Sequence, residues 1–364
     1  MNAEAPIMIM AGGTGGHVFP ALAVAGKLRE RGISLVWMGT RRGLEATLVP
    51  RAGIAIEWIG VAGLRGSGLQ RLLLAPFMVS KALLQAAAIL VRRKPCLVLG
   101  MGGFVSGPGG LMARCLGIPL VVHEQNALAG MTNRWLSRLA SRVLEAFPDS
   151  FPSARRALVV GNPVRDSIAA LSAPAYRFAA RSGCPRLLVV GGSQGALALN
   201  LLVPRALALL AAEIRPEVWH QAGGRLQELT TAAYREAGVN ARLEPFIEDM
   251  AAAYGWADLV LCRAGAITVA ELAAAGVGAV LVPFPHAVDD HQSANARFLE
   301  RGGAAVIAPQ ASLTAERLAE LLRDLLGDRA RLLAMAEAAR RLAHIDAAER
   351  VAAVCLEQAR RGDR

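Results

Sequence analysis

Aromatic residues, paired cysteines and an export signal are scarce or missing in this chain of 364 residues. Aromatic types make up only 5% of the chain and apolar types as a whole 54%, so the core must be built mainly from aliphatic residues and glycine. The five cysteines form no CxxC pair, which argues against a disulfide scaffold and favours reduced packing thiols of a cytosolic protein. The opening segment MNAEAPIMIMAGGTGG lacks the positive charge and the long apolar run of a signal peptide, so we expect no export.

Acidic residues are absent between Glu57 and Glu124, although the whole chain carries 40 Lys and Arg against 29 Asp and Glu. The charged residues of this interval are all basic: Arg65, Arg71, Lys81, Arg92, Arg93, Lys94 and Arg114. They account for +7 of the formal net charge of +11. A positive balance indicates phosphates, nucleic acid or an anionic membrane surface as partners, and charge alone does not choose among them.

Residues 69–91 are rich in leucine and resemble a membrane span at first sight. Pro76 and Lys81 interrupt the run, whereas a span needs about 20 mostly apolar residues without a central charge. The segment better fits a helix that lies on an anionic membrane surface. Its expected membrane contacts are Leu73, Leu74, Phe77, Lys81, Arg92 and Arg93. A core helix with solvated basic ends is the equal alternative.

Strand and helix patterns alternate along the whole chain, which predicts an α/β fold of two tandem, doubly wound, Rossmann-like domains. A buried strand at residues 6–11, a glycine-rich turn and a helix open the chain, and the same order recurs from residue 186. We expect domains at residues 1–163 and 164–345, followed by a helix at 346–364 that can pack back on the first domain. The stretch at residues 147–167, which contains Pro148, Pro152 and Pro163, is the expected linker region. Such sheets bind ligands at the carboxyl ends of their strands, so the cleft between the domains is the expected active site.

Glycine-rich turns follow strands at residues 12–16, 100–107, 191–195 and 263–266. Glycines let backbone N–H groups approach an oxygen ligand closely, and a helix that follows adds its positive end. None of the turns reads G-x-G-x-x-G, and the chain has no Walker lysine motif and no Asp-x-Asp pair. The pattern therefore predicts binding of a nucleotide or diphosphate without a bound metal or other cofactor.

Six motifs carry a more specific signal: GGTGGH, GMGGFVSGP, HEQNALAG, GNPVR, GGSQGA and RAGAITVAEL. Together they resemble the MurG family of bacterial glycosyltransferases over nearly the whole chain. The resemblance implies the GT-B fold and inverting transfer of N-acetylglucosamine from UDP-N-acetylglucosamine. The implied acceptor is the 4-hydroxyl of N-acetylmuramoyl-pentapeptide on undecaprenyl diphosphate (lipid I to lipid II). The implied place is the cytoplasmic face of the inner membrane, in peptidoglycan synthesis, with peripheral attachment and no nucleic acid partner.

The resemblance also assigns roles to residues at the matching motif positions. Those implied to bind the donor are Thr14, Gly15, Gly16, Asn126, Arg165, Ser193, Ile247, Ala266, Ile267, Thr268, Val269, Ala270, Glu271 and Gln292. Those implied to hold the acceptor diphosphate are Gly13, Gly102, Gly103 and Ser106. Within the first set, Ser193 would bond the diphosphate, Ile247 would contact the uracil and Glu271 would take the ribose hydroxyls. Gln292 would bond hydroxyls of the sugar and is placed from the downstream Asn295 and Ala296.

A single displacement needs a base near the acceptor hydroxyl, and His17 at the start of a helix is the first candidate. The alternative is that His17 only binds substrate or caps the helix. Glu124 is the rival base, or else a buried carboxylate that holds its loop. Two other functions stay open: a UDP-N-acetylglucosamine 2-epimerase of the same architecture and, less well supported, a basic binding protein without enzymatic activity.

Overall fold

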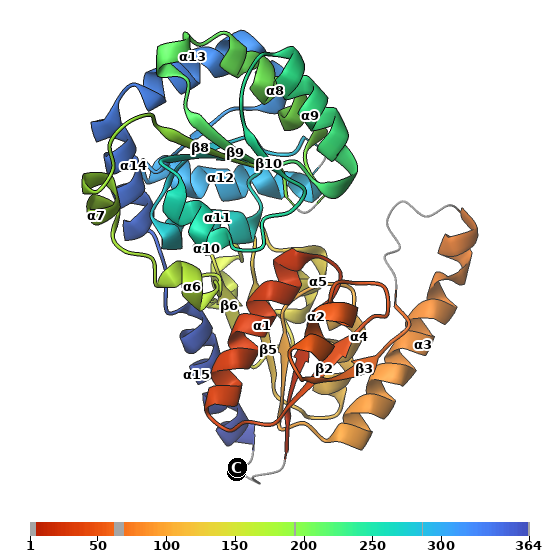
Figure 1. Ribbon diagram of the computed structural model, residues 1–364. Coiled ribbons are helices and arrows are strands. Elements are labelled where there is room, and N and C mark those ends of the chain that lie inside the picture. Colours follow the sequence, from red (N-terminus) through yellow and green to blue (C-terminus); the bar gives the residue numbers. More distant parts are fainter. Residues whose placement is uncertain (1–4, 62–68, 193, 286, 363–364) are drawn as a thin grey trace. The chain divides into compact units, whose positions relative to one another are not determined.

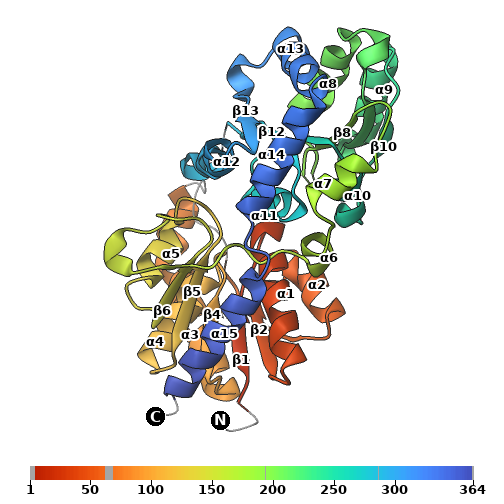
Figure 2. The same cartoon turned by 90° about the vertical axis from the view of Figure 1, so that its left-hand side faces the viewer.

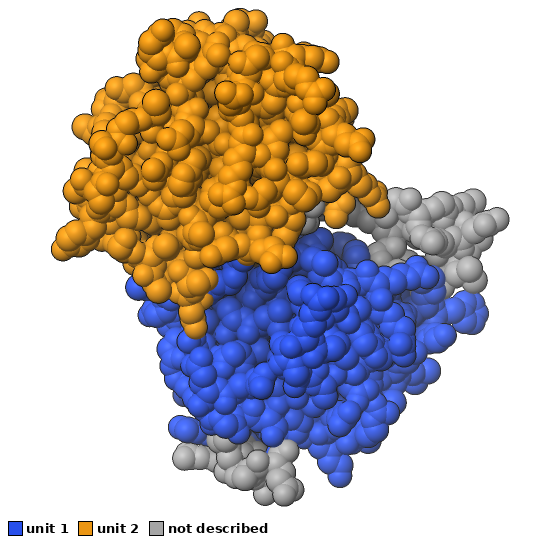
Figure 3. Space-filling model, viewed as in Figure 1, with its two compact units in different colours: residues 1–165, 345–364 blue, residues 166–344 orange. Residues whose placement is uncertain are grey.

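The computed structural model describes residues 5–61, 69–192, 194–285 and 287–362, without the side chains of residues 69–75 and 288. The chain divides into two compact units, coloured separately in Figure 3. Unit 1 comprises Met1–Arg165 together with Ile345–Arg364, and unit 2 comprises Asp166–His344. Unit 2 is therefore one continuous stretch of chain, whereas unit 1 is completed by the last residues.

Unit 1 contains a parallel sheet with the strand order β3-β2-β1-β4-β5-β6-β7. Its strands are β1 (Ile7–Met10), β2 (Leu35–Gly39), β3 (Ala55–Trp58), β4 (Leu97–Gly100), β5 (Leu120–Glu124), β6 (Arg142–Glu145) and β7 (Leu158–Val159). Its helices are α1 (Gly15–Glu30), α2 (Glu45–Arg51), α3 (Leu69–Arg93), α4 (Ser106–Cys115), α5 (Met131–Leu136) and α15 (Ala347–Gly362).

Alternate residues of β1 serve two separate cores, one on each face of the sheet. Ile7 and Ile9 pack with α1 and α15 on one face, and Met8 and Met10 pack with α3 and α4 on the other. Because both faces are covered, β1 is apolar at every position instead of alternating with polar residues. Figure 2 shows α15 lying alongside the strands of unit 1.

Unit 2 repeats this architecture with the strand order β10-β9-β8-β11-β12-β13, also parallel. Its strands are β8 (Arg186–Val190), β9 (Glu217–Gln221), β10 (Arg242–Glu244), β11 (Leu259–Cys262), β12 (Gly278–Leu281) and β13 (Ala305–Ile307). Its helices are α6 (Asp166–Ala169), α7 (Pro174–Ala179), α8 (Leu197–Ala208), α9 (Gln227–Glu236), α10 (Met250–Trp256), α11 (Ala266–Ala275), α12 (His291–Arg301), α13 (Ala315–Leu326) and α14 (Arg329–Arg341). In Figure 1, α8, α9 and α13 cover one face of this sheet and α11 the other.

The two doubly wound sheets confirm the predicted α/β fold class, and one segment differs from its expectation. The proline-containing stretch around residues 147–167, expected as a linker, contributes β7 to the edge of the unit 1 sheet through pairing with β6. Only two residues of this strand pair, and Arg155 and Arg156 precede it, so its apolar pattern is too short to be recognised.

The strand order reverses once in each sheet, between β1 and β4 in unit 1 and between β8 and β11 in unit 2. At such a switch point, the connections leave on opposite faces and open a crevice at the carboxyl ends of the strands. The four glycine-rich turns follow these same four strands. Each unit therefore presents a pair of glycine loops at the place where doubly wound sheets bind ligands.

Candidate functional site

The glycine loops after β1 and β4 touch each other in unit 1. A Cβ atom on Gly103, where φ is +80°, would lie 2.3 Å from the carbonyl oxygen of Gly12. A Cβ atom on Gly102 would likewise lie 2.6 Å from Nδ1 of His17. Only glycine permits both the backbone conformation and this approach, so the two loops form one continuous surface beside the His17 ring.

His17 lies in the first turn of α1, half-buried, with its Nδ1 2.9 Å from the side-chain oxygen of Gln125. The amide nitrogen of Gln125 lies 3.1 Å from Nδ1 of His123, and Nε2 of His123 lies 3.0 Å from the carbonyl oxygen of Gly161. His123 and Gln125 are buried, whereas His17 reaches the surface of the unit. Burial lowers the pKa of His123 from 6.5 to about 4, so this ring is neutral near neutral pH.

Glu124, the rival base, holds the loop that follows β5. Its carboxylate, only 2% exposed, accepts hydrogen bonds from the backbone and side-chain nitrogens of Asn126, the backbone N–H of Gly130 and the side chain of Asn133. Four donors, three from the loop and one from α5, occupy the two oxygens at 2.8–3.2 Å. This geometry favours the alternative role, a buried carboxylate that fixes the loop and presents Asn126.

Gly13 and Ser106, both predicted to hold the acceptor diphosphate, form hydrogen bonds within unit 1. The backbone N–H of Gly13 donates to the buried carboxylate of Glu45, which also accepts from the backbone and hydroxyl of Thr40. The Ser106 hydroxyl is buried 2.8 Å from the carbonyl oxygen of Gly102. Both therefore shape the loops, and their role toward a ligand stays a prediction.

The remaining predicted residues of unit 1 lie around the same loops. Thr14 is the N-cap residue of α1, and Gly15 and Gly16 are its first helical residues, where backbone N–H groups lack intrahelical acceptors. The Arg165 guanidinium lies 6.0 Å from the centre of the Phe19 ring on α1. Their contacts to a donor stay predictions.

In unit 2, the glycine loop after β8 is pressed against the loop after β9. A Cβ atom on Gly195, where φ is +74°, would lie 2.0 Å from the carbonyl oxygen of Ala222. Ser193, the predicted diphosphate ligand of this loop, lies outside the described residues. α8 begins at Leu197 directly after the loop, so its positive end faces this turn.

Gln221, the last residue of β9, joins two parts of the predicted donor site. Its amide nitrogen donates to the carbonyl oxygen of Gly192 at 2.9 Å, and its oxygen accepts from the backbone N–H of Ile247 at 2.9 Å. Gln221 is 3% exposed and Ile247 is 2% exposed. The predicted diphosphate loop and the predicted uracil contact are thus held by one side chain.

The predicted stretch Ala266, Ile267, Thr268, Val269, Ala270 and Glu271 forms the first turns of α11, with Gly265 as N-cap. Glu271 is 7% exposed and accepts a hydrogen bond from the Tyr254 hydroxyl at 3.2 Å. At the other end of the helix, Arg177 and Arg340 donate to the last carbonyl oxygens of α11. These two cations match the negative carboxyl end of α11, and the positive amino end of the helix is suited to bind an anion.

Gln292 lies in α12 close to the turn after β11. Its side-chain oxygen accepts from the backbone N–H of Phe284 at 2.9 Å and of Ala264 at 3.3 Å. Asn295, used to place it in the motif, is fully buried and donates to the carbonyl oxygen of Ala264. The Gln292 oxygen fixes two loops, so its amide nitrogen is the end suited to meet a sugar hydroxyl.

The predicted membrane residues are spread along α3. The side chains of Leu73 and Leu74 lie outside the described residues. Phe77 is 76% exposed, and Lys81 lies one turn further along the same face. Arg92 and Arg93 both bind the carboxylate of Glu57 at 2.6 Å. At 1.5 Å per residue they lie about 24 Å along the helix from Phe77, so the structure does not gather them with the apolar residues.

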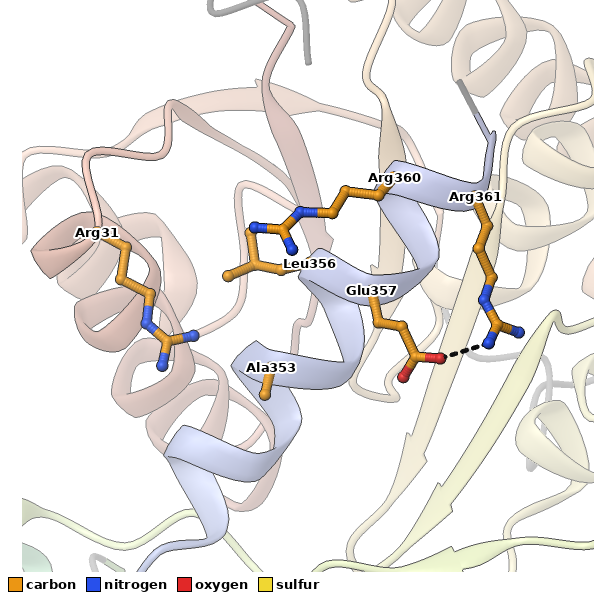
Figure 4. A pocket seen from close by; sticks show the side chains of 6 residues that line it. All are labelled: Arg31, Ala353, Leu356, Glu357, Arg360 and Arg361. Atoms are coloured by element: carbon orange, nitrogen blue, oxygen red, sulfur yellow. Dashed lines mark ion pairs between the residues drawn. The ribbon is translucent and has the colours of Figure 1, made fainter. Parts of the chain in front are cut away.

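A hollow of about 410 Å³ in unit 1 lies away from these residues (Figure 4). It is lined by Arg31, Ala353, Leu356, Glu357, Arg360 and Arg361. α1 ends at Glu30 and α15 passes Pro119 near its end, which places the hollow at the amino edge of the sheet, opposite the glycine loops. It contains no predicted site residue.

The described ranges contain neither a recognisable metal cluster nor a helix that could span a membrane. No cluster of three or more His, Cys, Asp or Glu side chains in these ranges is arranged to bind a metal. No described helix combines the length and the apolar character that crossing a membrane requires.

Three buried residues of the site were not identified from the sequence: Gln125, Gln221 and Glu45. Gln125 lies inside the HEQN motif, where the predictions chose its two neighbours Glu124 and Asn126. A polar residue at the carboxyl end of an apolar strand is a usable signal for Gln125 and Gln221. Glu45 gives no such signal, because a glutamate at a helix start is ordinarily solvated.

Comparison with known proteins places the chain among glycosyltransferases. The glycosyltransferase family 28 N-terminal domain matches residues 7–145, and the family 28 C-terminal domain matches residues 186–351. A protein of Nitrosococcus oceani is 60% identical over 97% of this chain and 98% of its own length. One of Methylococcus capsulatus is 58% identical over 97% and 98%. Both are named UDP-N-acetylglucosamine–N-acetylmuramyl-(pentapeptide) pyrophosphoryl-undecaprenol N-acetylglucosamine transferase. The crystal structure of Acinetobacter baumannii MurG is 44% identical, with a TM-score of 0.85 over 97% of this chain and 99% of that one.

Proposed function

The chain belongs to the MurG family of glycosyltransferases, and we propose that it performs the reaction for which its relatives are named, the transfer of N-acetylglucosamine from UDP-N-acetylglucosamine to lipid-linked N-acetylmuramoyl-pentapeptide. The observation that carries the proposal is 60% identity along 97% of the chain. The product is lipid II, and the reaction belongs to peptidoglycan synthesis.

In the proposed chemistry, the 4-hydroxyl oxygen of the acceptor forms a bond to C1 of the sugar. The bond between C1 and the UDP oxygen breaks, and its electron pair leaves with UDP. The hydroxyl proton passes to His17, which lies in the unit 1 loops that we assign to the acceptor. Attack from the face opposite the leaving group inverts the configuration at C1.

The departing diphosphate needs positive charge, and unit 2 supplies it from its backbone. The turn of residues 191–195 precedes α8, and the amino end of α11 follows the turn after β11. Backbone N–H groups and helix ends of this kind stabilise phosphate oxygens. We therefore assign the UDP part of the donor to unit 2, with Glu271 on the ribose and Gln292 on the sugar, and we include no tightly bound metal.

The uracil contact follows from the chemistry of its ring. The N3–H group of uracil is a donor and needs an acceptor. Because the Ile247 N–H is bound by Gln221, we assign the uracil N3–H to the carbonyl oxygen of Ile247.

The test is transfer of labelled N-acetylglucosamine from the UDP sugar to a lipid-linked muramoyl-pentapeptide by the purified full chain. We expect acceptor-dependent formation of a labelled disaccharide lipid. Conversion of UDP-N-acetylglucosamine to its 2-epimer without acceptor would instead support the epimerase. No transfer with a good acceptor rejects the proposal.

We also propose peripheral attachment to the cytoplasmic face of the inner membrane through the exposed side of α3. Phe77 and Leu84 are 76% and 72% exposed, and Lys81 lies on the same helical stripe at spacings of four and three residues. An exposed apolar stripe with a basic residue suits an anionic lipid surface. Arg92 and Arg93 are excluded from this contact, because Glu57 neutralises part of their charge.

Sedimentation with phosphatidylglycerol vesicles tests this attachment. Phe77→Ser combined with Leu84→Ser is expected to lower the bound fraction, because each change removes exposed apolar area without disturbing the core. Tyr176→Ser on α7, an aromatic side chain of unit 2 that is also 76% exposed, is the control. Equal binding by the double variant and the control would remove α3 as the membrane contact.

A further inference from the structure

Hydrogen bonds connect His17 through Gln125 and His123 to the carbonyl oxygen of Gly161. Which group donates in each bond is fixed by this buried carbonyl oxygen. A carbonyl oxygen cannot donate, so Nε2 of His123, 3.0 Å from the Gly161 oxygen, must carry the hydrogen. Because burial keeps the pKa of His123 at about 4, the ring holds a single proton near neutral pH. Its Nδ1 is therefore an acceptor, and the Gln125 amide nitrogen donates to it at 3.1 Å.

This direction passes on to His17. With the amide nitrogen of Gln125 turned toward His123, its oxygen faces Nδ1 of His17 at 2.9 Å and can only accept. The amide is held in this orientation by a second bond to the His123 carbonyl oxygen at 3.2 Å. Asn162, next to Gly161, also donates to the Gln125 backbone at 2.9 Å, so strand β5 and the GNPVR segment are tied together around the amide.

We propose that Gln125 and His123 are positioning residues that set the tautomer of His17, with the hydrogen on Nδ1 and the lone pair on Nε2. This inference rests on the proposed function, in which His17 takes the acceptor proton. A ring with its hydrogen on Nε2 would offer Nδ1 as its acceptor, and Nδ1 faces the Gln125 amide rather than a substrate. The hydrogen bonds among His123, Gln125 and His17 thus decide which ring nitrogen of His17 is basic.

An uncharged partner has a second consequence for the base. A carboxylate beside the ring would stabilise the imidazolium and retain the proton after transfer, whereas a neutral amide orients the ring without that effect. The carboxylates nearest in the fold are engaged elsewhere. Glu124 binds the loop after β5, and Glu45 binds Gly13 and Thr40. The guanidinium of Arg165 lies 6.0 Å from the ring centre of Phe19, which is on α1 like His17.

Nitrogen NMR of the full chain labelled with ¹⁵N-histidine tests the tautomer directly, in the absence of substrate. We expect a His17 signal with the hydrogen on Nδ1, opposite to His123 and His220. His220 donates from Nε2 to the Asn200 oxygen and serves as the internal reference. Gln125→Leu should move His17 toward the Nε2–H form and leave the His220 signals unchanged. A His17 tautomer that is Nε2–H in the unaltered protein, or unchanged in Gln125→Leu, would overturn the proposal.

Gln125→Glu is the conservative partner variant, because a carboxylate still accepts from His17 but no longer donates to His123. It should keep the hydrogen on Nδ1 and move the acid side of the transfer pH profile to higher pH. Gln125→Leu should lower kcat by on the order of tenfold with little change in the KM for either substrate. A profile that does not move in Gln125→Glu would count against the positioning role.

Failure of the tautomer assignment and failure of the proposed function would give different results. If the tautomer shifts in Gln125→Leu while kcat stays unchanged, His17 is not the base, and the positioning of its ring stands apart from catalysis. If the tautomer is as inferred but the unaltered chain shows no transfer, the proposed function fails and the tautomer assignment stands.

Discussion

Both units contain a buried neutral histidine beside a buried glutamine at the carboxyl end of a strand, and they use the pair differently. Unit 1 has His123 and Gln125 at the end of β5, and unit 2 has His220 and Gln221 at the end of β9. Burial lowers the pKa of His123 to about 4 and that of His220 to about 3. The same residue types therefore enter both sites in the same uncharged state.

The difference lies in where the hydrogen bonds end. His220 is closed on both sides, by the Tyr234 hydroxyl at 2.9 Å and the Asn200 oxygen at 3.1 Å, and Asn200 itself binds the chain at Ala222. The chain from His123 runs outward instead and ends on His17, whose ring reaches the surface. We propose that the closed network makes the predicted donor loops of unit 2 rigid, whereas the open one directs the lone pair of His17 toward a substrate.

Removing His17, the exposed end of the unit 1 network, should have the largest effect on activity. His17→Ala is expected to lower kcat by about 10²–10⁴-fold, because it removes the proposed base, with a much smaller change in the KM for the UDP sugar. Steady-state kinetics with both substrates varied provide the measurement. Equal losses in kcat and in donor affinity would mean that His17 binds substrate and does not take the proton.

The closed network should appear in the pH dependence of stability. Folding lowers the pKa of His220 from 6.5 to about 3, so as the pH falls the unfolded chain takes up the proton before the folded chain does. The contribution of the neutral histidine to stability is therefore complete above pH 6.5 and is lost as the pH falls toward the pKa of the folded state. At pH 5, the free energy of unfolding of the protein is lower for this reason by about 2 kcal/mol than well above pH 6.5.

Urea unfolding at pH 7 and pH 5 measures this loss. His220→Gln is expected to reduce the difference between the two pH values by about 2 kcal/mol, whatever its effect at pH 7. The same pH difference in variant and unaltered chain would show that His220 is not held neutral in the fold.

The glutamine of unit 2 should give the smallest effect, confined to the donor. Gln221→Leu leaves the Gly192 oxygen and the Ile247 N–H without their partner, so we expect the KM for UDP-N-acetylglucosamine to rise about tenfold with little change in kcat. Gln227→Leu, which removes an amide bound to the carbonyl oxygen of Leu243 in β10, is the control. A similar change in both variants would show loss of packing in unit 2 instead of a role in the donor site.

The periodicity of the sequence predicts most of the fold, because strands buried on both faces are continuous apolar runs. The run at residues 6–11 contains β1 (Ile7–Met10), and the run at 186–192 contains β8 (Arg186–Val190). The structure shows that the four glycine turns follow the strands at which the sheets reverse their order, which was not predicted. The last helix has an apolar face, but nothing in that face specifies that it packs on α1.

The site was less predictable, because the motif residues differ in what they touch. Glu124 and Gln125 are adjacent and both polar, yet one fixes a loop and the other faces His17. Which of them faces His17 depends on loops that arrive from residues 102 and 161. Such long-range contacts have no local pattern.

The return of the chain to unit 1 affects the order of events during synthesis. α15 buries Val351, Ala352, Cys355 and Ala359 in the same core as β1. That core therefore stays incomplete on the ribosome until α15 has emerged. Unit 2 is continuous, so it can finish folding before unit 1, although its residues are made later. Loss of the last twenty residues, Ile345–Arg364, would thus damage the half of the protein that begins the chain.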